Sequence, residues 1–183
     1  TTVTSGEDNR LRQGAFTLID VTEGVENATS NMGVYPAGGL GDFKKDADAL
    51  AQAGVCHFIY HTATFQGNTA AVSMVESLAT GLTQWAKNFN AAPDLIVIIR
   101  GGGAVNDLAY LDDYPLAAFL CKCSVPIWVG IGHEKDRTIL DEIAHRSFDT
   151  PSKVIGGIRN LIVERIQEVL QSHQSIRLLS QHQ

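Results

Sequence analysis

The sequence predicts an α/β fold: an open, mainly parallel sheet with helices on both faces (a Rossmann-like three-layer arrangement) and a long C-terminal helix. Two observations support this prediction. Apolar, β-rich runs alternate along the chain with stretches of helical periodicity, which is the order that builds a helix-covered parallel sheet. None of these runs alternates cleanly between apolar and polar residues, and such runs are typical of strands buried on both faces.

The expected strands are the four β-rich runs at residues 15–21, 55–61, 95–100 and 125–131. After the first run, residues 42–54 repeat apolar side chains at helical spacing, at Phe43, Ala47, Leu50 and Ala51. This helix is expected to stop at Gly54, since glycine suits the left-handed turn that closes a helix. Residues 70–86 carry a second helical stripe, at Val72, Val75, Leu78, Leu82 and Trp85. A third helix is expected to begin near Asp136 and to close at residues 141–148.

The C-terminal stretch predicts one long helix. Thr150 suits the N-cap and Pro151 the first turn. An apolar stripe then follows at Ile155, Ile158, Ile162, Ile166, Val169 and Ile176. Thirty helical residues reach roughly 45 Å, more than the sheet needs, so we expect the helix to pack on a partner or on further sequence. We therefore divide the chain into an α/β domain (1–150) and the start of a long helix (151–183). Because the chain starts at Thr1 rather than at Met, we expect a piece of a longer protein.

Composition narrows the class of protein. The formal net charge of −6 does not favour a general nucleic-acid or membrane coat, although a small basic site is compatible with it. No apolar run approaches the 18 or so residues that a membrane span needs. Cys56, Cys121 and Cys123 form no pairing or CxxC pattern, which indicates a reducing compartment, the cytoplasm, with buried or idle thiols.

Polar residues gather where the expected strands end. In chain order these are Asp42, Gln66 with Gly67, Arg100 with Gly101, Gly102 and Gly103, and His133 with Glu134 and Asp136. Ligands of open parallel sheets bind at the carboxyl ends of the strands, so we expect these groups at one rim.

The "RGGG" stretch predicts a phosphate-binding loop. Glycines let backbone N–H groups approach an anion closely, and the guanidinium of Arg100 matches two phosphate oxygens. A tight turn whose arginine makes a structural salt bridge remains the alternative. Neither a dinucleotide fingerprint nor a P-loop is present, because the required spacings are absent.

The "GHEKD" stretch offers proton-transfer groups. His133 at a strand end could shuttle protons near neutral pH, with Asp136 orienting the imidazole. The plainer alternatives are a structural histidine and N-caps at Asp136 and Asp42. His133, Glu134 and Asp136 could also hold a divalent metal, although they lack the paired histidines of a zinc protease helix.

Taken together, "RGGGAVNDLAYLDD", "VPIWVGIGHEKDRTILDEIA" and "TPS" resemble the large subunit of exonuclease VII. "TFQGNTAAVSMVESL" and "GGLGDF" extend the resemblance, which runs from about Phe16 to about Leu161. That family shows RGGGS with a following DL pair, then GHE-x-D-x-T-x-x-D, then a TP-S/T helix start. Several ordered motifs at the right spacing are more specific than any one of them.

The resemblance implies a catalytic domain that degrades single-stranded DNA from its ends to short oligonucleotides. It implies a small-subunit partner, homo-oligomerisation through the C-terminal helix, and cleavage for which Mg²⁺ is not obligatory. Matched position by position, it implies catalytic roles for Asp42, Arg100, His133 and Asp136. Phosphate contacts are expected from the glycine loop and from Gln66 and Gly67.

Several positions depart from the family pattern. Ala104 stands in place of serine and Asn106 in place of an acidic residue, an insertion separates Val21 from Pro36, and "KVIGGI" replaces an alanine-rich run. These departures leave open a catalytically inactive phosphate- or nucleic-acid-binding module on the same fold. A small-molecule phosphoryl enzyme on this scaffold is a third hypothesis.

Overall fold

The computed structural model describes residues 14–21, 39–100, 105–131 and 137–180, with side chains described for 42–100, 108–131 and 137–177. Its elements, in chain order, are β1 (Gly14–Val21), α2 (Gly39–Gln52), β2 (Cys56–Thr62), α3 (Ala70–Phe89), β3 (Leu95–Arg100), η1 (Val105–Leu111), α4 (Tyr114–Cys121), β4 (Ile127–Gly130), α5 (Ile139–Ile143), β5 (Arg146–Ser147) and α6 (Pro151–Ser180).

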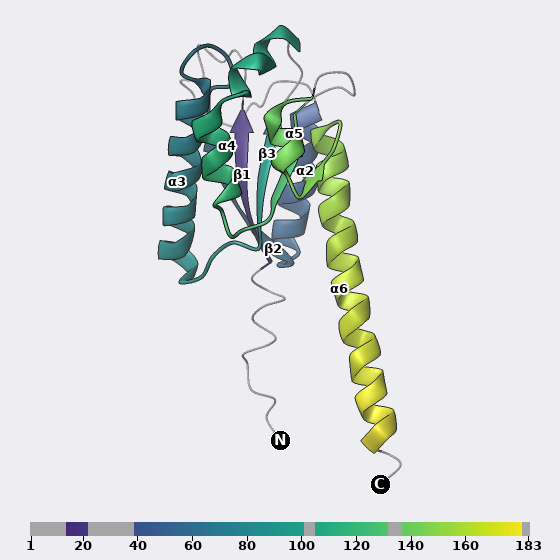
Figure 1. Cartoon of the computed structure of the whole chain (residues 1–183). Coiled ribbons are helices and arrows are strands. Elements are labelled where there is room, and N and C mark those ends of the chain that lie inside the picture. Colours follow the sequence, from purple (N-terminus) through teal and green to yellow (C-terminus); the bar gives the residue numbers. More distant parts are fainter. Residues whose placement is uncertain (1–13, 22–38, 101–104, 132–136, 181–183) are drawn as a thin grey trace.

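The strands form one parallel sheet in the order β2-β1-β3-β4-β5. Figure 1 shows helices on both sides of it, so the predicted three-layer fold is confirmed. α3, α4 and α5 pack on one face, and α2 and α6 pack on the other. The chain runs from β1 outward to β2 and then returns across β1 to β3. The direction of winding therefore reverses between β1 and β3.

β3 shows how the two layers of core form. All six of its residues are buried, as the unbroken apolar run predicts. Ile96 and Ile98 join the core under α3 and α4, whereas Val97 and Ile99 join the core under α2 and α6. Successive side chains of a strand point to opposite faces, so a strand covered on both sides must be apolar throughout.

The prediction that every strand is buried on both faces is wrong for β2. Most of its residues are half-buried or exposed, because β2 lies at the edge of the sheet. Burial still shifts two pKa values there. It raises the pKa of the Cys56 thiol to about 12, so the thiol stays protonated, and it lowers the pKa of the His61 imidazole. Neither group is needed by the site described below.

The prediction of one helix from near Asp136 to residue 148 is also wrong. α5 spans only Ile139–Ile143, and the chain then forms β5 beside β4. The backbone N–H of His145 donates to the Ile127 carbonyl at 2.8 Å, and the Ile127 N–H donates to His145 Nδ1 at 3.1 Å. Pairing of β5 with the edge of β4 is thus more favourable than continuation of the helix. The helical periodicity of the sequence carries no information about this pairing.

The two longer predicted helices are confirmed, with a shifted face in α3. Gly54 has φ +67°, and the N–H of Val55 donates to the Leu50 carbonyl at 3.1 Å, as in a glycine-terminated helix end. Val72 is 59% exposed, so the prediction that it lies on the buried face of the helix is wrong. The buried residues of α3 are Ala70, Ala71, Met74, Leu78, Gly81 and Trp85. In α2, Ala51 is exposed instead of buried.

α6 has the predicted 30 residues and the predicted start, where the Lys153 N–H donates to Thr150 Oγ1 at 3.3 Å. Val154, Ile155 and Ile158 are buried against the sheet. Further along, the helix leaves the sheet (Figure 1), and Ile166, Val169 and Ile176 of the predicted stripe are exposed. Among the described residues, no helix combines the length and apolar character that crossing a membrane demands.

Candidate functional site

The switch of winding direction places a candidate site at the carboxyl ends of β1 and β3. In open α/β sheets, the connections after two such strands leave toward opposite faces and a ligand binds between them. Val21 and Arg100 are register partners, so the two strands end at the same level. α2 follows β1 on one face, and η1 and α4 follow β3 on the other.

Arg100 is the last residue of β3 and is only 3% exposed. It lies on the same face of the strand as Ile96 and Ile98, toward α3 and α4. A guanidinium keeps its charge at any physiological pH, and removing it from water is costly unless anionic or polar groups surround it. A rigid, buried strand that delivers a cation to the switch point is therefore suited to hold an anion.

Gln66 and Gly67 lie where predicted, in the turn between β2 and α3 at the same edge of the sheet. Gly67 has φ +76°, a backbone conformation that glycine adopts without strain, and its carbonyl accepts from the Ala70 N–H at 3.0 Å. Gln66 is half-buried. The turn explains the glycine, and a phosphate contact from either residue stays a prediction.

Asp42 lies in the first turn of α2 and is exposed. The helix begins at Gly39, so Asp42 is not its N-cap and that alternative is wrong. A carboxylate in the first turn is favoured by the positive end of the helix. Since α2 covers the face opposite to that of Arg100, Asp42 and Arg100 lie on the two sides of the switch point.

The remaining predicted site residues, Gly101, Gly102, Gly103, His133, Glu134 and Asp136, lie outside the described residues, as does the insertion between Val21 and Pro36. The elements that flank them are described. Residues 101–104 follow β3, and residues 132–136 follow β4 and precede α5. The N-cap of α5 is Thr138.

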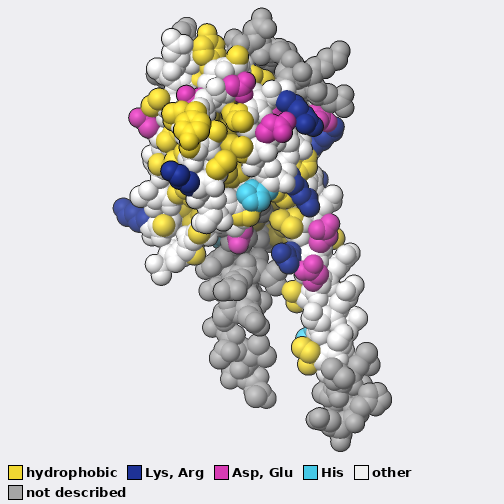
Figure 2. Space-filling view, in the orientation of Figure 1, with side chains coloured by type: hydrophobic (Ala, Val, Ile, Leu, Met, Phe, Trp, Pro, Cys, Tyr) yellow, Lys and Arg dark blue, Asp and Glu magenta, His cyan; other side chains and the backbone are white. Residues whose placement is uncertain are grey.

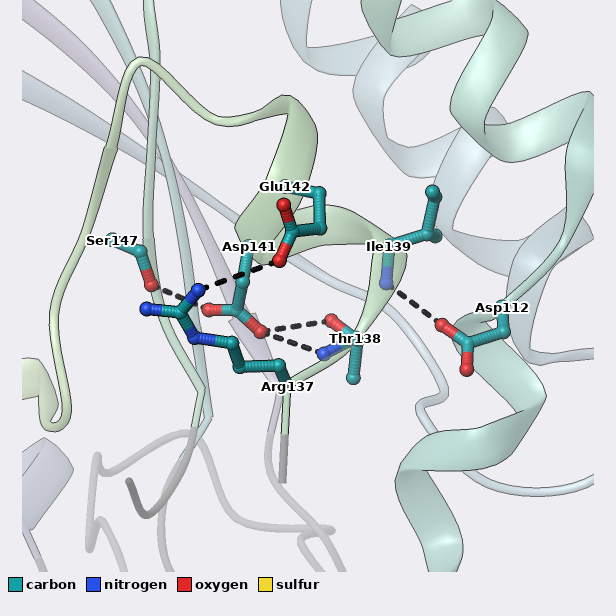
Figure 3. Close-up of polar contacts among 7 residues, drawn as sticks. All are labelled: Asp112, Arg137, Thr138, Ile139, Asp141, Glu142 and Ser147. Atoms are coloured by element: carbon teal, nitrogen blue, oxygen red, sulfur yellow. Dashed lines mark hydrogen bonds and ion pairs between the residues drawn. The ribbon is translucent and has the colours of Figure 1, made fainter. Parts of the chain in front are cut away.

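A hydrogen-bond network centred on Thr138 and Asp141, shortly after the "GHEKD" stretch, joins three segments of the chain (Figure 3). Asp141 Oδ2 accepts from the Thr138 N–H at 2.9 Å and from Thr138 Oγ1 at 3.1 Å, and Asp141 Oδ1 accepts from Ser147 Oγ. Asp112 Oδ1 accepts from the Ile139 N–H at 2.7 Å. The connection after β3, the start of α5 and strand β5 are thereby held together at the carboxyl edge.

Replacing Asp141 by Ala is expected to lower the free energy of unfolding by about 1–2 kcal/mol, because a helix cap and a bond to β5 are lost together. Urea unfolding followed by circular dichroism measures the change. The neighbouring Glu142→Ala variant is the control. Its ion pair with Arg137 spans 3.5 Å between exposed side chains and contributes little. Equal stabilities for the two variants would contradict the capping role of Asp141.

Sequence reasoning missed this network although signals for it exist. Thr138 and Asp141 have the spacing of a capping box, in which the third helical residue accepts from the N-cap N–H. α4 was missed in the same way. Asp113 before Tyr114 and Pro115 is a helix start signal, and its Oδ1 accepts from the Leu116 N–H at 2.9 Å.

Comparison with known proteins gives one consistent result. The family described as "Exonuclease VII, large subunit" matches residues 35–183. The chain is 39% identical over 141 residues to the exodeoxyribonuclease 7 large subunit of Deinococcus radiodurans, covering 77% of this chain and 33% of that protein.

The exodeoxyribonuclease 7 large subunit of Nostoc sp. is 31% identical to this chain, over 64% of this chain and 28% of that protein. The large subunit of Koribacter versatilis is 34% identical, over 62% of this chain and 23% of that protein. The chain thus spans about a third or less of the curated relatives it matches. The family match covers most of the length of this chain. This chain belongs to the exonuclease VII large-subunit family.

Proposed function

We propose that this chain is the catalytic domain of a single-strand-specific exodeoxyribonuclease that hydrolyses DNA phosphodiester bonds to short oligonucleotides. The observation that carries the proposal is the buried guanidinium of Arg100 at the β1–β3 switch point of a chain in this family. The same edge of the sheet carries Asp42, for which a catalytic role is predicted, and Gln66 and Gly67, for which phosphate contacts are predicted.

Phosphodiester hydrolysis requires neutralisation of developing charge, an oriented water and protonation of the leaving oxygen. In this proposal Arg100 and the backbone N–H groups of Gly101–Gly103 bind the phosphate. His133 transfers the proton, and Asp42 or Asp136 orients the imidazole or the water. No divalent metal is obligatory. His133, Glu134 and Asp136 remain the residues on which Mg²⁺ would bind if cleavage depends on it.

The proposal extends to partners and location. The exposed Ile166, Val169 and Ile176 of α6 suit a helical partner, which we propose to be the small subunit, with association of large subunits through the same helix as a further step. We place the complex in the cytoplasm. The thiols of Cys121 and Cys123 are free, in keeping with a reducing compartment.

The full-length protein, together with its small subunit, is expected to release short oligonucleotides from end-labelled single-stranded DNA and to leave blunt duplex intact. His133→Ala is expected to abolish release while single-stranded DNA still binds. Gel electrophoresis of the products and a filter-binding assay measure the two properties.

If the wild-type complex binds single-stranded DNA and never cleaves it, the nuclease proposal is wrong. The inactive binding module, favoured by Ala104 and Asn106 in place of the family's residues, would then be the function. Cleavage that survives His133→Ala would instead contradict the role of the histidine. Repeating the assay with a chelator tests whether a divalent metal is dispensable.

A further inference from the structure

A hollow of about 470 Å³ lies between the beginnings of α4 and α5. Its walls include Asp112, Tyr114, Ala117, Arg137, Ile139 and Glu142. α4 and α5 each begin after a parallel strand has ended, so the hollow lies at the same edge of the sheet as Arg100. η1, which leads from β3 to α4, lies at that end of the molecule in Figure 1.

The tyrosine that lines the hollow, Tyr114, is 84% exposed. Tyr110, four residues earlier and outside the lining, is 45% exposed. α4 consists almost entirely of apolar residues, yet only Leu116 and Leu120 are buried. Figure 2 shows apolar side chains gathered over α4 beside charged groups. Exposed tyrosines next to a concave site are typical of surfaces on which a planar ligand stacks.

Charge decides which part of a DNA strand fits this hollow. The residues that line the hollow include three carboxylates, of Asp112, Asp113 and Glu142, and one cation, Arg137. Arg137 already pairs with Glu142 at 3.5 Å. A phosphate would be repelled by this lining. A nucleobase is uncharged, presents a π-face to tyrosine, and in three of the four bases carries amino donors that carboxylates accept.

We infer that the hollow is a base-binding subsite in which Tyr114 stacks on one nucleobase of single-stranded DNA while a phosphate of the same strand is held at Arg100. This inference rests on the proposed function. It adds a contact with a base to a site otherwise described through phosphates. It also explains a preference for single strands, because a paired and stacked base has no free face for tyrosine.

The test uses the full-length enzyme with its small subunit and short single-stranded oligonucleotides. Tyr114→Ala is expected to raise KM about tenfold, within the range measured for losing one base-stacking contact. Tyr114→Phe keeps the ring and is expected to retain wild-type KM. Val72→Ala on α3 removes another exposed apolar side chain, 59% exposed, and is expected to change nothing.

Oligonucleotides with a single abasic position make the test specific for a base. One such position is expected to raise the KM of the wild-type enzyme about tenfold, and Tyr114→Ala is expected to be insensitive to it. An unchanged KM in Tyr114→Ala, or equal abasic effects in both enzymes, overturns the subsite while cleavage by the wild type upholds the proposed function. A wild-type enzyme without cleavage indicates failure of the proposed function itself, and binding of the same oligonucleotides then tests the subsite.

Discussion

Replacing Arg100 by Met is expected to lower the rate of DNA cleavage by about 10²–10³-fold. The size of the loss follows from removing one preorganised charged donor from a site where negative charge develops. Arg100 is only 3% exposed and already interacts with other groups of the protein, so its replacement is also expected to lower the melting temperature.

The Arg100→Lys variant distinguishes a functional arginine from a structural one. If Arg100 served only a salt bridge in a βα turn, Arg100→Lys would keep that bridge and the wild-type rate. Arg100→Lys keeps the charge but loses the planar fork, so an intermediate rate is expected. Single-turnover cleavage and thermal unfolding measure the two quantities.

Arg165→Met is the matched control for the Arg100 variant. Arg165 lies on the exposed part of α6, where its guanidinium pairs with Glu168 at 2.9 Å. The substitution makes the same change in net charge far from the switch point, so cleavage is expected to stay at the wild-type rate. Equal losses in both variants would mean that net charge, and not the position of Arg100, governs activity.

Replacing Gly157 by Ala is expected to lower the free energy of unfolding by about 1–3 kcal/mol, the usual cost of overpacking a core. A Cβ atom there would lie 2.8 Å from Phe148 Cζ and 3.1 Å from Trp128 Cζ3. The two rings are themselves in contact, with centroids 5.4 Å apart. The Trp128 ring cannot withdraw freely, since Trp128 is buried within β4 under α6.

Gly156 provides the control for Gly157, one residue earlier in the same helix. A Cβ atom at Gly156 would meet nothing within 4 Å. Gly156→Ala is therefore expected to raise the free energy of unfolding by up to about 1 kcal/mol, because alanine is the better helix former. Chemical denaturation of both variants gives the difference. Stabilisation by Gly157→Ala would show that α6 does not pack on the Trp128 and Phe148 rings as described.

The glycine pair also accounts for part of a departure from the family pattern. "KVIGGI" stands where an alanine-rich run is usual. Gly157 is needed because α6 approaches two aromatic rings at this level, whereas nothing in the packing explains Gly156. The sequence could mark the departure but could not separate the two glycines, since both occupy neighbouring positions of one helix.

Long, strongly patterned elements were predictable from local sequence. The bounds of β3 and the Thr150 start of α6 agree with the structure because continuous burial and helix capping leave direct signals in the residues involved. Shorter elements were not predictable in this way. β5 exists because two residues pair with the edge of β4, and that edge is created only by the folded sheet.

Sequence alone determined the layer structure and the family, because periodicity and ordered motifs are carried by the residues themselves. Tertiary structure alone decided the strand order, the reversal between β1 and β3, and hence which side of the rim each group occupies. It also decided the contacts of Asp112 and Asp141 and the hollow beside Tyr114. These depend on pairings between segments far apart in the chain, about which local periodicity carries no information.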